Sequence, residues 1–347
     1  WSLTRRSDQP MTSLKQTIEQ LVERKDLTLH EAERAVESVI AGADPHQVAA
    51  FLVLLRAKGE TPQEVAGMVV AMRKHMIPVP INGTTVDIVG TGGDGADTLN
   101  FSTAASIVAA SCGARVAKHG NRSVSSKSGS ADVLQALGVK LELTPSQVAS
   151  CLDSASIAFM FAPVFHPAMK TIVPVRKGLG VRTVFNILGP LLNPAGAGRL
   201  LIGVYQERLV ELMANALHEL KVERAMVVCC GGLDELAPTS VASVAEVTPV
   251  GVTYSKLDPE QLGFKPCTVA DLKGGDAEHN AAMLKEVISG KRPGPLEDTV
   301  VLNAGAALYV AGKAESVQKG CEMAVGSIRS AKPMETLNKW ASACAAF

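Results

Sequence analysis

A glycine-rich loop, GTGGD at Gly90–Asp94, is the first segment of the sequence that could bind a ligand. It follows the apolar stretch TVDIVG at 85–90 and shortly precedes FSTAASIVAASCG, which has the composition of a helix. Backbone N–H groups and a helix dipole at such a junction can hold phosphate oxygens, and glycine lets the chain approach them closely. The loop lacks the GK[ST] of a P-loop and is not GxGxxG, so a tight turn without a ligand is the alternative interpretation.

A second donor-rich segment, the basic loop, begins with KHGNR at Lys118–Arg122 and follows the strand-like stretch at 115–120. The polar side chains that accompany its two cations are Ser123, Ser125 and Ser126, with Asn100, Ser102 and Thr103 near the start of the helix after the glycine loop. Alone, this segment is equally well interpreted as a solvated loop capped by serines. Two such loops together favour a phosphorylated ligand, because hydroxyls and fixed cations are good donors to phosphate.

An acidic pair, Asp234 and Glu235 in GGLDE at 231–235, ends the apolar stretch AMVVCC at 225–230. Two carboxylates beside a phosphate repel it unless a hard divalent cation lies between them, and magnesium is the natural candidate. A surface turn with two solvated acids is the alternative interpretation.

The elements that must position these loops alternate between strands and helices. Strands are expected at 85–90, 115–120, 199–204, 225–230 and near 244–254, and helices at 101–113, 131–138, from 144, at 207–220, and within 276–312 on either side of the loop at 292–295. This alternation predicts the α/β class, with a largely parallel sheet covered on both faces. Ligands bind at the carboxyl ends of such strands, where all three loops lie.

The first part of the chain, from Ser13 to about Met76, instead has apolar residues at helical spacing. Four short helices are expected there. Their start signals are the capping boxes Ser13–Gln16, Thr28–Glu31 and Thr61–Glu64 and the pair Asp44-Pro45. The Pro-interrupted stretch at 161–180 is expected to form short helices or loops that rejoin these helices.

Charge is balanced, since the 347 residues include 34 basic and 34 acidic side chains and the formal net charge is zero. No overall field attracts the protein to nucleic acid or an anionic membrane, and neither partner is expected. Seven cysteines without a CxxC pair predict reduced thiols rather than a disulfide framework or a zinc site. The apolar stretches are broken well before the about 18 residues of a membrane span.

Residues 1–10, WSLTRRSDQP, have the composition of a presequence remnant or of a leader left by cloning, while Met11 would suit a bacterial start. The predicted location is the cytoplasm in the bacterial case, and the plastid stroma if residues 1–10 are a presequence remnant.

The motifs taken in order resemble those of the anthranilate phosphoribosyltransferase family, from about Leu14 to about Leu337. GTGGD and KHGNRS are followed by HPAxK at 166–170, VRxxLGxRT at 175–183, NxLGPLxNP at 186–194 and GxDE at 232–235. The resemblance implies transfer of the phosphoribosyl group from phosphoribosyl pyrophosphate (PRPP) to the amine of anthranilate, releasing pyrophosphate, in tryptophan biosynthesis. Mg²⁺ is the implied cofactor.

The same resemblance implies a fold and an assembly. A small N-terminal helical domain, 11–82 plus about 162–188, would pack on a larger α/β domain, 83–161 plus 189–347, with a mostly parallel central sheet. This is the nucleoside phosphorylase or phosphoribosyltransferase type of fold. A homodimer formed mainly through the helical part is also implied.

The resemblance also implies site residues, which are assigned here by their positions within the shared motifs. PRPP would be bound by Gly90, Gly93, Asp94, Thr98, Asn100, Phe101, Ser102, Thr103, Lys118, His119, Gly120, Asn121, Arg122, Ser123, Val124, Ser125, Ser126 and Ser130. Mg²⁺ would be bound by Ser102, Asp234 and Glu235. Anthranilate would meet Gly90, Asn121, His166 and Arg176, whose guanidinium suits a carboxylate. No catalytic acid or base is assigned, because the neutral aromatic amine attacks with its own lone pair.

Two other functions fit part of this pattern. A pyrimidine nucleoside phosphorylase would have similar glycine loops, but its SGRGLxxTGGTxD signature does not occur here. A non-catalytic relative that binds nucleic acid would need a basic face, which the zero net charge and the intact acidic pair disfavour.

Overall fold

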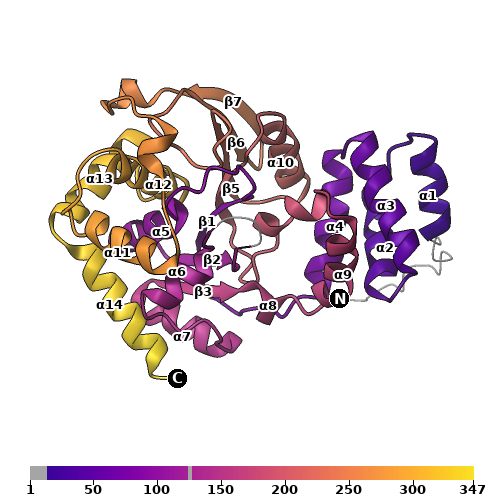
Figure 1. Cartoon of the computed structure of the whole chain (residues 1–347), viewed down its shortest axis with the longest axis horizontal. Coiled ribbons are helices and arrows are strands. Elements are labelled where there is room, and N and C mark those ends of the chain that lie inside the picture. Colours follow the sequence, from indigo (N-terminus) through magenta and orange to yellow (C-terminus); the bar gives the residue numbers. More distant parts are fainter. Residues whose placement is uncertain (1–13, 124–126) are drawn as a thin grey trace. The chain divides into compact units, whose positions relative to one another are not determined.

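A computed structural model of the chain describes residues 14–123 and 127–347. The chain divides into two compact units. The first combines Trp1–His75, described from Leu14 on, with Ala168–Phe185, and the second combines Met76–Pro167 with Asn186–Phe347. Figure 1 shows that the first unit is made of helices and that the second is built around a sheet.

From Leu14 on, where the structure describes it, the first unit contains the α-helices α1 (Leu14–Val22), α2 (Leu29–Ile40), α3 (Pro45–Lys58), α4 (Pro62–Lys74) and α9 (Met169–Leu179). The helix α2 packs on α4, α1 packs on α3, and α9 contacts both α2 and α3. The four N-terminal helices expected from the sequence are therefore confirmed, and a segment almost a hundred residues further along the chain completes the bundle.

Local capping residues set the starts of these helices. Thr28 and Glu31 form a reciprocal capping box, as do Thr61 and Glu64, and the Asp44 side chain accepts from the backbone N–H groups after Pro45. These three signals are confirmed, whereas Ser13 of the remaining box lies outside the described residues. Each cap satisfies N–H groups that would otherwise lack a partner at a helix start.

A seven-stranded sheet in the order β3-β2-β1-β4-β5-β6-β7 organises the second unit. The strands are β1 (Val86–Gly90), β2 (Val116–Gly120), β3 (Ile157–Phe161), β4 (Arg199–Gly203), β5 (Arg224–Cys230), β6 (Ala242–Thr248) and β7 (Gly251–Leu257). The first five in this order run parallel, and β6 and β7 are antiparallel additions. The carboxyl ends of β1, β2, β4 and β5 therefore share one edge of the sheet.

Strand β3 was not expected from the sequence. Its residues IAFMF are all buried, so they lack the polar alternation that marks a half-exposed strand. The preceding helix ends at Ser156, which has a left-handed conformation (φ 60°) and turns the chain into β3.

Helices surround this sheet: α5 (Phe101–Ser111), α6 (Ser130–Ala136), α7 (Pro145–Ala155), α8 (Ala162–Phe165), α10 (Arg208–Glu219), α11 (Ala277–Ile288), α12 (Pro295–Val310), α13 (Val317–Arg329) and α14 (Lys332–Ala345). Short 3₁₀ helices are η1 (Val184–Asn186), η2 (Gly189–Leu191), η3 (Pro259–Leu262) and η4 (Val269–Leu272). The helix α12 is buried along most of its length and packs on α5 and the central strands. Within the described residues, no helix combines the length and apolar character that a membrane crossing needs.

Candidate functional site

The glycine loop and the acidic pair meet at the carboxyl edge of the sheet. Gly90 ends β1 and is the register partner of Gly203, which ends β4. A side chain on Gly90 would overlap the carboxylate of Asp234, and one on Gly203 would overlap its backbone carbonyl. The Gly92 N–H, on a residue with φ 68°, donates to Oδ2 of Asp234 at 2.6 Å. Glycine is required here because three chain segments converge on one carboxylate.

The first turn of α5 joins the same site. The Ser102 N–H donates to Oε1 of Glu235 at 3.0 Å, and the Ser102 hydroxyl lies 3.3 Å from the Nζ of Lys118. The side chains of Phe101 and Thr103 face the buried core. Ser102 is therefore the residue of this turn that joins the acidic pair to the basic loop.

The two carboxyl groups of the acidic pair are costly to ionise within the protein alone. Burial, and then the nearby Asp94, raise the pKa of Asp234 to about 7. Burial, and then Asp234, raise the pKa of Glu235 to about 8, although the Lys118 charge acts in the opposite direction. Desolvated acids with raised pKa values are typical of functional sites, and a bound cation would favour their ionised forms.

The donor set around the acidic pair suits Mg²⁺. This ion commonly binds one or two protein carboxylates and completes its shell with water and substrate phosphates. Asp234, Glu235 and the Ser102 hydroxyl offer this kind of incomplete oxygen shell. Over the described ranges there is no cluster of three or more His, Cys, Asp or Glu side chains that could hold a metal without such added oxygens.

Lys118 lies beneath the loops rather than on the surface. It is 1% exposed, and its Nζ donates to the Ile88 carbonyl at 2.6 Å as well as approaching Ser102. Burial lowers the pKa of Lys118, against the opposing charges of Asp87 and Glu235. This cation is the positive counterpart of the acidic pair within the fold.

Asp87 in β1 lies next to these residues, although none of the sequence motifs includes it. Its carboxylate is fully buried and accepts from the His119 N–H at 3.2 Å and from the Asn193 amide at 2.7 Å. Burial raises the pKa of Asp87 to about 6, against the effect of Lys118. The sequence does carry a signal for Asp87, which is an acidic residue within the apolar strand VDIVG. A strand covered on both faces leaves no solvent for a carboxylate, so this side chain needs buried hydrogen-bond partners.

The described part of the basic loop is bonded to its own helix, α6. The Arg122 guanidinium contacts Asp132 at 2.7 Å and Gln135 at 2.8 Å, and the Ser123 N–H donates to Asp132 at 3.1 Å. The Ser130 hydroxyl donates to the Asn121 carbonyl at 3.3 Å. Val124, Ser125 and Ser126, also predicted to bind PRPP, lie outside the described residues.

His119 of the basic loop meets His166, which lies 47 residues further along the sequence. The Nε2 atoms of His119 and His166 are 3.1 Å apart, and the rings pack edge to face. Burial lowers the pKa of His119 to about 3 and that of His166 to about 4, so both rings are neutral at pH 7. In such a contact one ring donates and the other accepts.

Arg176 belongs to the helical unit, in the last turn of α9. It is half-buried, its guanidinium lies 6.0 Å from the ring centre of Phe185, and burial lowers its pKa. Gly93 and Thr98 remain with the glycine loop, where Thr98 forms an isolated bridge with Lys273. Within the second unit, the structure thus gathers the glycine loop, the start of α5, the described basic loop and the acidic pair.

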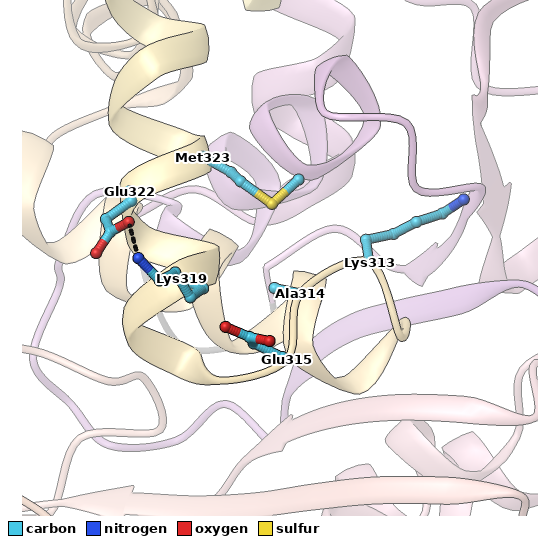
Figure 2. Close-up of a pocket in the computed structure, with 6 residues that line it drawn as sticks. All are labelled: Lys313, Ala314, Glu315, Lys319, Glu322 and Met323. Carbon is cyan, nitrogen blue, oxygen red and sulfur yellow. Dashed lines mark hydrogen bonds and ion pairs between the residues drawn. The ribbon is translucent and has the colours of Figure 1, made fainter.

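An open hollow elsewhere in this unit has a volume of about 510 Å³ and is lined by Lys313, Ala314, Glu315, Lys319, Glu322 and Met323 (Figure 2). Lys319 and Glu322, one turn apart on α13, pair at 2.8 Å. None of the predicted site residues lines this hollow, and its paired charges give it no evident ligand.

Comparisons with known protein families match both units. Residues 82–333 match the a/b domain of the glycosyl transferase family, and residues 15–76 match the helical bundle domain of that family. The anthranilate phosphoribosyltransferase of Methanosarcina acetivorans is 47% identical over 95% of this chain and 90% of its own length. That of Rhodopseudomonas palustris is 46% identical over 97% of this chain and 100% of its own length.

Solved structures of related enzymes also match the fold of this chain. The anthranilate phosphoribosyltransferase of Thermus thermophilus has a TM-score of 0.90 at 42% identity, with 95% of this chain and 99% of that chain covered. The Saccharomyces cerevisiae enzyme in complex with PRPP and Mg has a TM-score of 0.88 at 27% identity, with 97% and 99% covered.

Proposed function

Because this chain belongs to the anthranilate phosphoribosyltransferase family, we propose that its glycine loop, the start of α5 and the acidic pair bind PRPP together with Mg²⁺. The chain transfers the phosphoribosyl group of PRPP to the amine of anthranilate and releases pyrophosphate, in tryptophan biosynthesis. The observation that carries the site is the convergence of Gly92, Ser102, Asp234 and Glu235 through short hydrogen bonds. Neither the nucleoside phosphorylase nor the nucleic-acid-binding alternative is favoured by the named relatives.

Asp234, Glu235 and the Ser102 hydroxyl would hold the magnesium. The raised pKa values of both acids support this, since burial, and then the nearby carboxylates, disfavour their ionised forms and a divalent cation would favour them. The yeast relative in complex with PRPP and Mg supports the same cofactor. When bound, Mg²⁺ neutralises negative charge on the pyrophosphate group that leaves.

The oxygen atoms of PRPP would accept hydrogen bonds from the other donor groups at the carboxyl edge of the sheet. The residues proposed are those carried over from the family motifs, with Gly90, Gly93, Asp94, Thr98 and Asn100–Thr103 from the first loop and helix, and Lys118–Ser126 with Ser130 from the basic loop. Phe101 and Thr103 have buried side chains, so these two residues shape the turn rather than extend a side chain toward solvent.

The transfer breaks the bond between ribose C1 and the pyrophosphate oxygen, and forms a bond from C1 to the anthranilate nitrogen. Positive character develops on the sugar and negative charge on the leaving group, so fixed donors and positioning supply most of the catalysis. Lys118 and the backbone N–H groups of the glycine loop provide fixed positive potential. The attacking amine is neutral, and its surplus proton can leave to solvent after the bond forms.

The acceptor residues proposed are Gly90, Asn121, His166 and Arg176. The Arg176 guanidinium matches the anthranilate carboxylate in charge and geometry. The neutral His119–His166 pair adds an uncharged aromatic surface, which suits a planar ring and does not compete with Arg176 for the carboxylate.

A homodimer is part of the proposal and rests on the family resemblance; sedimentation equilibrium tests it. A cytoplasmic location, or the plastid stroma if residues 1–10 are a presequence remnant, also stays a prediction, because those residues lie outside the described chain.

The loss of anthranilate fluorescence tests donor, acceptor and metal together. With PRPP present, fluorescence should fall in the presence of MgCl₂ and stay constant in EDTA. No loss from folded protein with both substrates and MgCl₂ would contradict the proposed reaction, and equal loss in EDTA would contradict the magnesium site.

A further inference from the structure

A buried asparagine on α11 joins three segments of the donor side of the site. Asn280 is 1% exposed, and its amide donates to Oδ1 of Asn100 at 3.0 Å and to the Ser128 hydroxyl at 2.9 Å. Its own Oδ1 accepts from the Gly275 N–H at 2.7 Å. Both amide hydrogens and the oxygen therefore have partners, which is the full use expected of a buried polar group.

The partners of Asn280 lie where the two donor loops end. Asn100 is the N-cap residue of α5, at the end of the connection from the glycine loop to this helix, but its side chain does not cap the helix. Ser128 lies between the basic loop and α6, and its backbone carbonyl accepts from the Asn100 amide at 3.3 Å. A single side chain thus fixes the end of one loop relative to the end of the other, across 180 and 152 residues of sequence.

The segment before α11 is packed to hold Asn280 in place. A side chain on Gly274 would meet the Asn280 amide at 2.6 Å. The adjacent backbone is also tied to the glycine-loop side, since Leu99 N–H donates to the Leu272 carbonyl at 3.0 Å and Gly274 N–H to the Asp97 carbonyl at 2.9 Å. Figure 1 shows α11 beside α6 and α5, which it contacts.

We propose that Asn280 is a positioning residue for PRPP, which sets the separation of the glycine loop and the basic loop so that both reach one bound molecule. Asn280 itself touches no ligand. The inference rests on the proposed PRPP site, and it assigns a role to a residue that none of the sequence motifs contains. Because PRPP must meet donors from both loops at once, a loss of their relative placement weakens its binding more than it slows the chemical step.

Calorimetric titration of PRPP with MgCl₂ into the full-length protein tests this role. Asn280→Ala should weaken PRPP binding about tenfold and raise the PRPP KM similarly, because it removes the two hydrogen bonds that link the loop ends, together with the one from Gly275. The anthranilate KM and kcat should change less than threefold. Asn280→Asp keeps the acceptor but removes the amide donors and adds negative charge near the phosphates, so it should weaken PRPP binding at least as much.

Ser128 and Ser327 supply the partner variant and the control. Ser128→Ala should weaken PRPP binding by a smaller factor, and the double variant with Asn280→Ala should lose less than the product of the two factors, because both remove the same contact. Ser327→Ala breaks a 2.7 Å hydrogen bond to Ser111 near the far end of α5. It should lower Tm without changing PRPP affinity.

The results separate the role of Asn280 from the existence of the site. If the unmodified protein binds no PRPP, the proposed site itself is wrong. If it binds PRPP, and Asn280→Ala lowers Tm as Ser327→Ala does while PRPP affinity stays unchanged, Asn280 is only a structural residue and the inference is overturned. A folded Asn280→Ala or Asn280→Asp protein with selectively weakened PRPP binding supports it.

Discussion

At the carboxyl edge of the sheet, the acidic pair and the Arg122 end of the basic loop differ in how far along the sequence their hydrogen-bond partners lie. Asp234 and Glu235 accept hydrogen bonds from distant segments and keep raised pKa values. Arg122 and Ser123 of the basic loop are bonded to Asp132, only ten and nine residues away. The acidic pair is thus held by distant segments and is costly to ionise without a further cation, whereas Arg122 of the basic loop is neutralised locally by Asp132. Binding of PRPP with Mg²⁺ should supply the cation that favours the ionised acidic pair. It should also turn Arg122 from Asp132 toward a phosphate.

The largest expected effect comes from neutralising the acidic pair. Asp234→Asn with Glu235→Gln should lower kcat/KM at least about a hundredfold, because charge stabilisation at a leaving group is worth this much in similar sites. The folded state should not be destabilised near pH 8, since the variant removes the repulsion between the two carboxylates. Steady-state kinetics and a thermal melt measure both quantities. Near-normal kcat/KM in the folded double variant would refute the metal-site assignment.

Arg176, in the other unit, should affect the acceptor rather than the donor. Arg176→Gln should raise the anthranilate KM about tenfold or more, the loss expected for a charged carboxylate contact, while the PRPP KM changes less than threefold. Lys177→Gln, an exposed neighbour on α9, is the matched control and should behave as the unmodified enzyme. Equal increases in both KM values for Arg176→Gln would remove its assigned role.

The pH dependence of stability should distinguish the acidic pair from the rest of the molecule. An acid whose pKa is raised in the folded state stabilises that state at low pH and loses this contribution as pH rises through the folded pKa. With pKa values of about 7 and about 8 for Asp234 and Glu235, the free energy of unfolding should fall between pH 6.5 and 8, by roughly 1 kcal/mol per pH unit.

The histidine pair contributes in the opposite direction, because its depressed pKa values lower stability as pH falls below about 6.5. Denaturant melts between pH 6.5 and 8 therefore isolate the acids. The fall should be reduced by saturating MgCl₂ and by Asp234→Asn with Glu235→Gln. A slope that both treatments leave unchanged would assign the effect to other groups.

The smallest effect is expected at the basic loop. Arg122→Ala removes a partly exposed ion pair, so it should cost less than about 1 kcal/mol of stability. If Arg122 turns from Asp132 to a phosphate on binding, Arg122→Ala should raise the PRPP KM a few-fold. Gln135→Ala removes only the hydrogen bond between Gln135 and Arg122, so it should leave that KM unchanged. An effect as large as that of the acidic variant would show that the two regions do not differ as described.

The sequence predicts best what is local. The helix starts at Thr28, Asp44 and Thr61 follow from side chains three or fewer residues from the N–H groups that they cap. The strand-end position of the loops also follows, because alternating strands and helices give a parallel sheet whose ends share one edge. Strand β3 was missed because its short apolar run carries no period that separates a buried strand from a helix.

Pairings across the sequence could not be read in this way. The contact between His119 and His166, the burial of Asp87 against Asn193, and the link from Asn280 to Asn100 each join segments from 47 to 180 residues apart. No local pattern marks such partners, since any polar residue in these segments would equally suit a solvated loop. The pairing of Arg122 with Asp132 on α6 is local, yet it was not predicted, because the sequence suggests only a cation available to phosphate.

Calorimetric titration of PRPP at several MgCl₂ concentrations tests whether the acidic pair holds the magnesium. The two proteins compared are the unmodified protein and the variant Asp234→Asn with Glu235→Gln. PRPP affinity should rise with MgCl₂ in the unmodified protein, and this dependence should be largely lost in the variant. The same magnesium dependence in both proteins would show that the acidic pair does not hold the metal.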